Sequence, residues 1–79
     1  MKIKDLRCKV SSATIIDVRF ARDKRDAIND VSYHTVSIVG LYDHDKLNDF
    51  DIEFIYPREK DVLEAWVVFD GNTEDLWIE

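Results

Sequence analysis

Alternating apolar side chains are the feature that most constrains how this chain can fold. Between residues 6 and 20, every even position holds an apolar or small side chain, while several of the odd positions are charged. Successive side chains of a β-strand point to opposite faces, so this alternation predicts half-buried strands. The stretch is longer than the usual strand of about 5–6 residues, and we place a bend or tight hairpin loop at 11–13. Such a loop would keep Cys8 opposite Ile16 on one face.

Two further strands are predicted downstream. Residues 31–42 are rich in β-branched and aromatic side chains of both parities, which is typical of a strand covered on both faces. Residues 50–56 alternate apolar with charged side chains and predict a strand with its aromatic face inward, ending at Pro57. The polar segment 21–30 is predicted to be a loop or at most one helical turn, and 43–49 a loop.

Residues 58–69 fit two descriptions. As a helix, the segment would begin after Pro57 and end before Gly71, an arrangement that helices favour. As a strand, it would end in the β-favouring run 66–69, followed by a strong turn signal and a last short apolar segment. The run and the turn favour the strand.

These segments predict a mainly β fold, a small antiparallel sheet or partly open barrel of five to six strands, within one domain spanning 1–79. The alternative is an α+β fold with one helix near 58–69. No apolar run approaches the ~18–20 residues of a membrane span, and no apolar stretch follows the basic start as in a secretory signal. The one cysteine, Cys8, fits a reducing, cytoplasmic location.

Charge is distributed unevenly along the chain. Residues 1–42 carry eight basic and five acidic side chains, whereas residues 43–79 carry three basic and twelve acidic ones. Such asymmetry between halves is typical of a protein that interacts with a charged partner. The alternative is that the two halves face each other in the fold and partly neutralise.

Catalytic motifs are missing from the sequence. Cys8 falls on the apolar face of the first predicted strand, where a thiol packs as a small hydrophobic group. The two histidines, His34 and His44, do not have metal-ligand spacing with this cysteine. Paired carboxylates fall in polar loops or on outward faces, where a solvated acidic surface is expected. We therefore predict no enzyme activity, no catalytic residue and no cofactor.

The acidic segment that begins at Asp43 was compared with a calcium-binding loop. An EF-hand loop has glycine at its sixth position and glutamate at its twelfth. In a loop that begins at Asp43 these positions hold Asn48 and Phe54, so we predict no metal site. The net charge of −6 opposes direct contact with nucleic acid, which requires lysine and arginine to displace counterions from phosphates.

A protein-binding role remains. Two tryptophans, Trp66 and Trp77, would fill the core or anchor a partner, and Trp66 is the better anchor because the strand interpretation places it opposite the apolar face. We predict a small acidic inhibitor or adaptor that docks on a basic surface of a partner, such as a nucleic-acid-binding enzyme, its carboxylates occupying positions otherwise taken by phosphates. The predicted docking residues are Asp43, Asp45, Asp49, Asp51, Glu53, Glu59, Asp61 and Trp66.

The small acidic inhibitors that phages and other mobile elements direct against host defence enzymes are comparable in size and charge, and they serve here as an analogy only. The alternative function is a self-associating structural β domain, a homodimer without catalytic activity, in which an unprotected strand edge pairs with a second copy.

Overall fold

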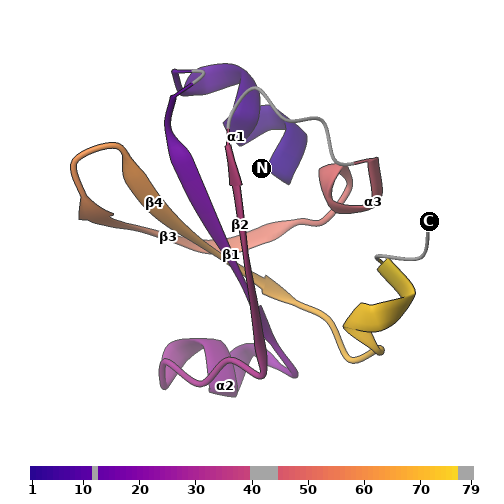
Figure 1. The fold of residues 1–79 in the computed structure, drawn as a ribbon. Coiled ribbons are helices and arrows are strands. Elements are labelled where there is room, and N and C mark those ends of the chain that lie inside the picture. The colour runs from indigo at the N-terminus through magenta and orange to yellow at the C-terminus, as the bar shows by residue number, and fades with distance from the viewer. Residues whose placement is uncertain (12, 40–44, 77–79) are drawn as a thin grey trace.

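The computed structural model describes residues 1–11, 13–39 and 45–76 and shows one open, mixed sheet (Figure 1). Strand β1 lies antiparallel to β2 and parallel to β4, and β3 lies antiparallel to β4, which gives the order β2-β1-β4-β3. The strand bounds are Ile15–Ala21 for β1, His34–Val39 for β2, Ile52–Glu59 for β3 and Val62–Val68 for β4.

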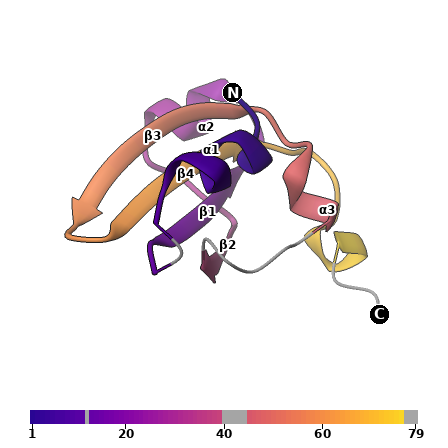
Figure 2. The same ribbon diagram turned by 90° about the horizontal axis from the view of Figure 1, so that it is seen from above.

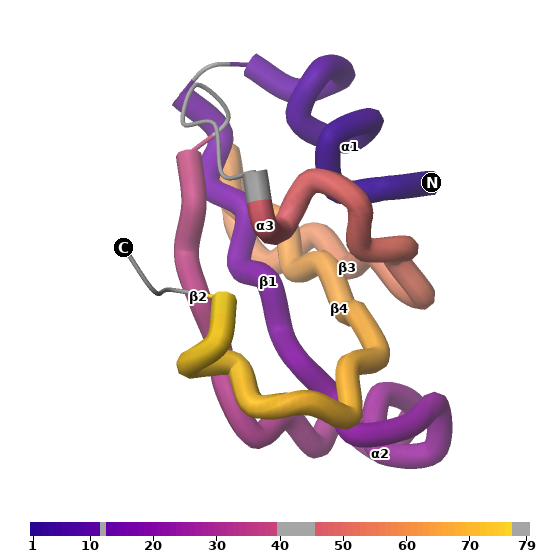
Figure 3. The backbone as a smooth tube through the Cα atoms, turned by 90° about the vertical axis from the view of Figure 1, so that its right-hand side faces the viewer, coloured from indigo at the N-terminus to yellow at the C-terminus, as the bar shows by residue number. Residues whose placement is uncertain are grey.

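Short helices join and cover the strands. They are α1 at Ile3–Lys9, α2 at Lys24–Ile28, α3 at Asp45–Asn48 and a 3-10 helix, η1, at Thr73–Leu76. Figure 3 shows α1, α3 and η1 in front of the sheet, and α2 near its lower end. None of the helices described here has the length and apolar character needed to cross a membrane.

The main core lies between the sheet and the layer formed by α1 and α3 (Figure 2). The even positions of β1 face it, as the alternation predicts, and Val18 lies between Val36 of β2 and Ala65 of β4 in the strand register. Ile3 of α1 and Leu47 of α3 close the other side and are fully buried. The Cα atoms extend over 30 × 29 × 18 Å, and the short dimension fits an open sheet with short helices rather than a closed barrel.

The prediction of a strand before residue 11 is wrong, because Ile3–Lys9 is a helix. Ile3 and Leu6 are three residues apart, so a helix buries both on one face, and the Asp5 carboxylate accepts a hydrogen bond from the Lys2 backbone N–H at 3.0 Å. Cys8 consequently lies exposed on α1 and does not face Ile16 across a hairpin.

The prediction of five to six strands, all antiparallel, is also wrong. Four strands are present in the described residues, and the central pair β1 and β4 runs parallel. The helix at the N-terminus removes one predicted strand, and η1 occupies the start of the last one, of which residues 77 and 78 lie outside the described residues. The fold is therefore mainly β with short helices added, which fits a small α+β domain.

The segment 58–69 is largely β-strand, as the β-favouring run predicts, and the helical alternative near 58–69 is wrong. Pro57 does not end the preceding strand, because β3 continues to Glu59. This strand forms an edge of the sheet, where a residue without an N–H loses no ladder hydrogen bond if it faces outward. The polar segments also contain more helix than predicted, since α2 exceeds one turn and α3 lies within the predicted loop 43–49.

Contacts from Arg22, just after β1, and Tyr33, just before β2, hold the segment that follows β4. The Tyr33 hydroxyl donates to the Phe69 carbonyl at 2.7 Å, and the Arg22 guanidinium lies 3.7 Å from the Tyr33 ring centroid. Arg22 also donates to the Gly71 carbonyl at 3.0 Å. Burial raises the pKa of Tyr33, so the phenol remains a neutral donor at physiological pH.

Candidate functional site

Three of the predicted docking carboxylates lie beside lysines of the basic half of the chain. The pairs are Asp49 with Lys4 at 3.4 Å, Asp51 with Lys2 at 3.5 Å and Glu53 with Lys24 at 3.8 Å. Most of these side chains are well exposed, so each pair contributes little to stability. The pairs do show that the basic and acidic halves partly neutralise each other, which is the alternative that the charge distribution left open.

The remaining predicted carboxylates do not join this group. Glu59 and Asp61 lie at the turn between β3 and β4, and at roughly 3.3 Å per residue the length of β3 separates them from Asp51 by about 26 Å. Asp61 has a φ of 65°, so it serves the turn geometry. Asp43 lies outside the described residues, and Asp45 begins α3 without a described side chain. The structure thus does not bring the predicted carboxylates together in one patch.

Trp66 is not an exposed anchor, and this prediction is wrong. Its residue is 1% exposed and packs with Ala21, Ala27 and Phe54 in a second, smaller core. The strand interpretation placed Trp66 correctly on the face opposite Ala65. What it missed is α2, which covers that face and turns the ring into a core residue. Trp77 lies outside the described residues.

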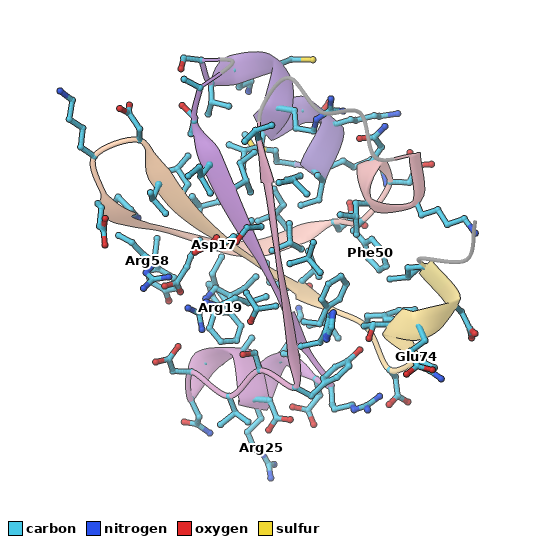
Figure 4. All side chains as sticks on the ribbon, in the orientation of Figure 1. Asp17, Arg19, Arg25, Phe50, Arg58 and Glu74 are labelled. Atoms are coloured by element: carbon cyan, nitrogen blue, oxygen red, sulfur yellow. The ribbon has the colours of Figure 1, made fainter. Side chains whose placement is uncertain are left out.

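The face of the sheet opposite α1 carries a charged cluster that the sequence did not predict. Asp17 on β1 is buried and accepts hydrogen bonds from Ser37 Oγ at 2.6 Å and from Arg58 Nη1 at 2.9 Å. Figure 4 shows Asp17, Arg19 and Arg58 close together on this side of the sheet. They come from β1 and β3, which are separated in the sheet by β4.

Glu64 on β4 joins the two guanidinium groups. Its Oε2 lies 3.2 Å from Arg58 Nε, and its Oε1 lies 3.5 Å from Arg19 Nε. Trp66 Nε1 donates to the same Oε1 at 3.0 Å, and the Arg19 guanidinium lies 5.8 Å from the Trp66 ring centroid. The cluster of Asp17, Arg19, Arg58 and Glu64 therefore balances two carboxylates against two guanidiniums and ties three strands together.

A small pocket lies beside this cluster, where α2 meets β3 and β4. It has a volume of about 260 Å³ and is lined by Ala27, Ile28, Asp30, Tyr56 and Glu64. Ile28 is 68% exposed and Tyr56 is 48% exposed, so two large apolar side chains lie at the surface beside two carboxylates. The Tyr56 ring stacks on Phe54, with 6.2 Å between ring centroids and 30° between ring planes.

The region combines exposed apolar area with charged side chains that are already paired. Within residues 1–11, 13–39 and 45–76, no group of three or more histidine, cysteine, aspartate or glutamate residues is placed to hold a metal ion. The carboxylates of Glu64 and Asp17 form ion pairs with guanidinium groups. Ile28 and Tyr56 expose apolar area that a second molecule could contact. The signal for the pocket in the sequence was Ile28, the one large apolar side chain in the polar segment 21–30.

Comparisons with known proteins add no functional information, since no protein-family model, curated protein or solved structure matches the chain.

Proposed function

We propose that this protein is a small, non-catalytic protein-binding module, an inhibitor or adaptor that docks on a basic surface of a partner protein. The observation that carries the proposal is the pocket beside α2, where the exposed side chains of Ile28 and Tyr56 lie next to Asp30 and Glu64. Aromatic and aliphatic side chains that leave water on binding supply affinity, and neighbouring charge supplies orientation.

The docking surface in this proposal is the face around α2 rather than the run from Asp49 to Glu53. Those carboxylates already lie beside lysines of the same chain, so a basic partner would have to displace them. The net charge of −6 acts at longer range and favours encounter with a positively charged protein. Nucleic-acid-binding proteins expose such basic surfaces, and they are the partner class that we propose.

The test is affinity capture from a bacterial lysate at about 0.05 M and about 0.5 M salt, read by mass spectrometry. We expect one basic protein on the native bait at low salt, with much less at high salt. Replacing Ile28 and Tyr56 together with serine is expected to remove it. The control is Ile55→Ser, which changes an exposed isoleucine on β3 outside the pocket lining.

Three outcomes would count against the proposal. Binding that is equal at both salt concentrations would remove the electrostatic contribution. Equal loss with Ile55→Ser would show that the pocket side chains have no special role. A third bait has Asp43, Asp45, Asp49 and Asp51 changed to asparagine. If this bait loses the partner and the Ile28 and Tyr56 double variant keeps it, the docking site lies at the acidic segment and not at the pocket.

A second candidate function is self-association through β2, and the difference between the two edges of the sheet favours it. Edge strands of natural proteins are usually protected against pairing by proline, charged side chains or bulges. The edge strand β3 contains Pro57 and Arg58 and has irregular register at two points. The edge strand β2 pairs with β1 in an unbroken register and contains no lysine, arginine, aspartate or glutamate. Its outer edge pairs with no described strand.

Light scattering coupled to size exclusion at micromolar concentration tests this candidate. We expect a dimer for the native protein and a monomer for Val39→Lys, because a charge at an edge disfavours strand pairing. Ile55→Lys on β3 is the matched control, since Val39 is 43% and Ile55 37% exposed. A native monomer, or equal loss of the dimer in both variants, would rule out pairing through β2.

A further inference from the structure

We propose that the pocket beside α2 binds a single arginine side chain. The inference rests on the proposed function, because the arginine would belong to the basic partner. It adds what that surface recognises: the aliphatic part of the side chain against Ile28 and Ala27, and its guanidinium between Asp30 and the Tyr56 ring.

The size of the pocket fits one side chain. Its volume is about 260 Å³, below the roughly 300–1,000 Å³ typical of pockets for drug-sized ligands and cofactors. Its lining combines an apolar wall with two carboxylates, which is the reverse of a site for a phosphate or another anion. An occupant with an aliphatic stem and a cationic head satisfies both parts of the lining.

Asp30 is the carboxylate that is available to a ligand. The two oxygens of Glu64 already face Arg58 and Arg19, whereas no hydrogen bond or ion pair joins the side chain of Asp30 to another described residue. The backbone of Asp30 is held in place by the hydrogen bond from its N–H to the Ala27 carbonyl at 3.3 Å. An incoming cation therefore meets a carboxylate that has no competing partner within the described chain.

Asp30 directly follows the C-cap of α2, and this position is compatible with a bound cation. Its φ of 61° is in the left-handed region, which favours glycine or asparagine at the end of a helix. The position also follows the last turn of α2, where backbone carbonyl groups disfavour a negative charge. Aspartate tolerates this conformation, and a bound cation would offset the repulsion between its carboxylate and the carbonyl groups at the end of α2.

Arginine suits the lining better than lysine. A guanidinium is planar, stacks on aromatic rings and can donate two parallel hydrogen bonds to one carboxylate, whereas an ammonium is a compact and strongly hydrated charge. The Tyr56 ring provides the flat surface, and its stacking on Phe54 limits the orientations it can take. Because Arg19 and Arg58 are paired with Glu64 and Asp17, their charges are largely neutralised beside the pocket.

The experiment is an NMR titration of the full chain with N-acetyl-arginine methylamide, a probe that needs no partner protein. We expect saturable shifts confined to the signals of Ile28, Asp30 and Tyr56, with a dissociation constant of about 1–10 mM. The citrulline analogue has the same shape without the charge and is expected to bind at least about tenfold more weakly, and the lysine analogue about threefold more weakly.

Two variants complete the design. Asp30→Asn keeps a residue that tolerates a positive φ, so the fold is retained, and it is expected to weaken the arginine probe about fivefold. Glu74→Gln removes an exposed carboxylate on η1 and is expected to leave the probe affinity unchanged. Shifts spread over the whole acidic surface without saturation, or an Asp30→Asn variant that binds as tightly as the native protein, would overturn the proposal.

The outcome is separable from that of the proposed function. Saturable arginine binding without any captured partner would retain the pocket and leave the proposed function unsupported. Capture of a basic partner that depends on Ile28 and Tyr56, without arginine binding, would retain the docking face and overturn the arginine pocket.

Discussion

Replacing Trp66 with alanine is expected to lower the free energy of unfolding by about 3–5 kcal/mol. The residue is 1% exposed, and its ring fills the space between Ala21, Ala27 and Phe54. A chain of 79 residues has a free energy of unfolding of roughly 4–12 kcal/mol, so this change removes a large share of it. If the native value lies at the lower end of this range, the variant would be unfolded. Urea denaturation followed by far-ultraviolet circular dichroism measures the loss.

The matched control for this prediction is Tyr56→Ala. Its ring is also aromatic and also faces the α2 side of the sheet, but it is 48% exposed, so we expect a loss below about 1 kcal/mol. A Trp66→Ala variant that is as stable as Tyr56→Ala would contradict the second core.

The interior of the sheet could be predicted from the sequence because the alternation of apolar and polar side chains indicates which face of a strand is buried. The even positions of β1 and the odd positions of β4 face the main core, as the period of two indicates. The position of Trp66 on the opposite face follows from the same rule. The alternation does not indicate which element packs on each face of the sheet. For this reason Trp66 was expected at the surface.

The N-terminal helix was missed because the apolar pattern of a strand, with a period of two residues, and that of a helix, with a period of 3.6, are both compatible with so short a segment. Leu6, Cys8 and Val10 fit a strand, while Ile3 and Leu6 fit one face of a helix. Seven helical residues are too few for the apolar pattern to separate the two descriptions. The direction of β4 relative to β1 was missed for a different reason, since strand order and direction depend on how distant segments pack.

The charged cluster could not be predicted for the same physical reason. Asp17 is 41 residues from Arg58 in the sequence, and each member of the cluster alone resembles a solvated residue on an outward strand face. They meet because β4 lies between β1 and β3, an arrangement that no local pattern specifies. The carboxylates predicted for docking are close in sequence, but Glu53 and Glu59 lie at different points of β3, and Asp49 and Asp51 lie beside lysines.

Replacing Glu64 with alanine is expected to lower the free energy of unfolding by about 2–3 kcal/mol, the second-largest effect among these variants. The Glu64 side chain is 14% exposed and accepts the hydrogen bond from Trp66 Nε1. Its removal leaves that buried donor and the half-buried Arg19 guanidinium without their carboxylate. The cost of losing the Glu64 carboxylate is smaller for Arg58, because its side chain is more exposed and still pairs with Asp17.

Glu64→Gln separates the hydrogen bond from the charge. The amide oxygen can still accept from Trp66 Nε1, so urea denaturation should show about half the loss of the alanine variant. Glu59→Ala, an exposed glutamate at the β3–β4 turn, is the control and should change stability by less than about 0.5 kcal/mol. If Glu64→Ala matched Glu59→Ala, the cluster would contribute no net stability.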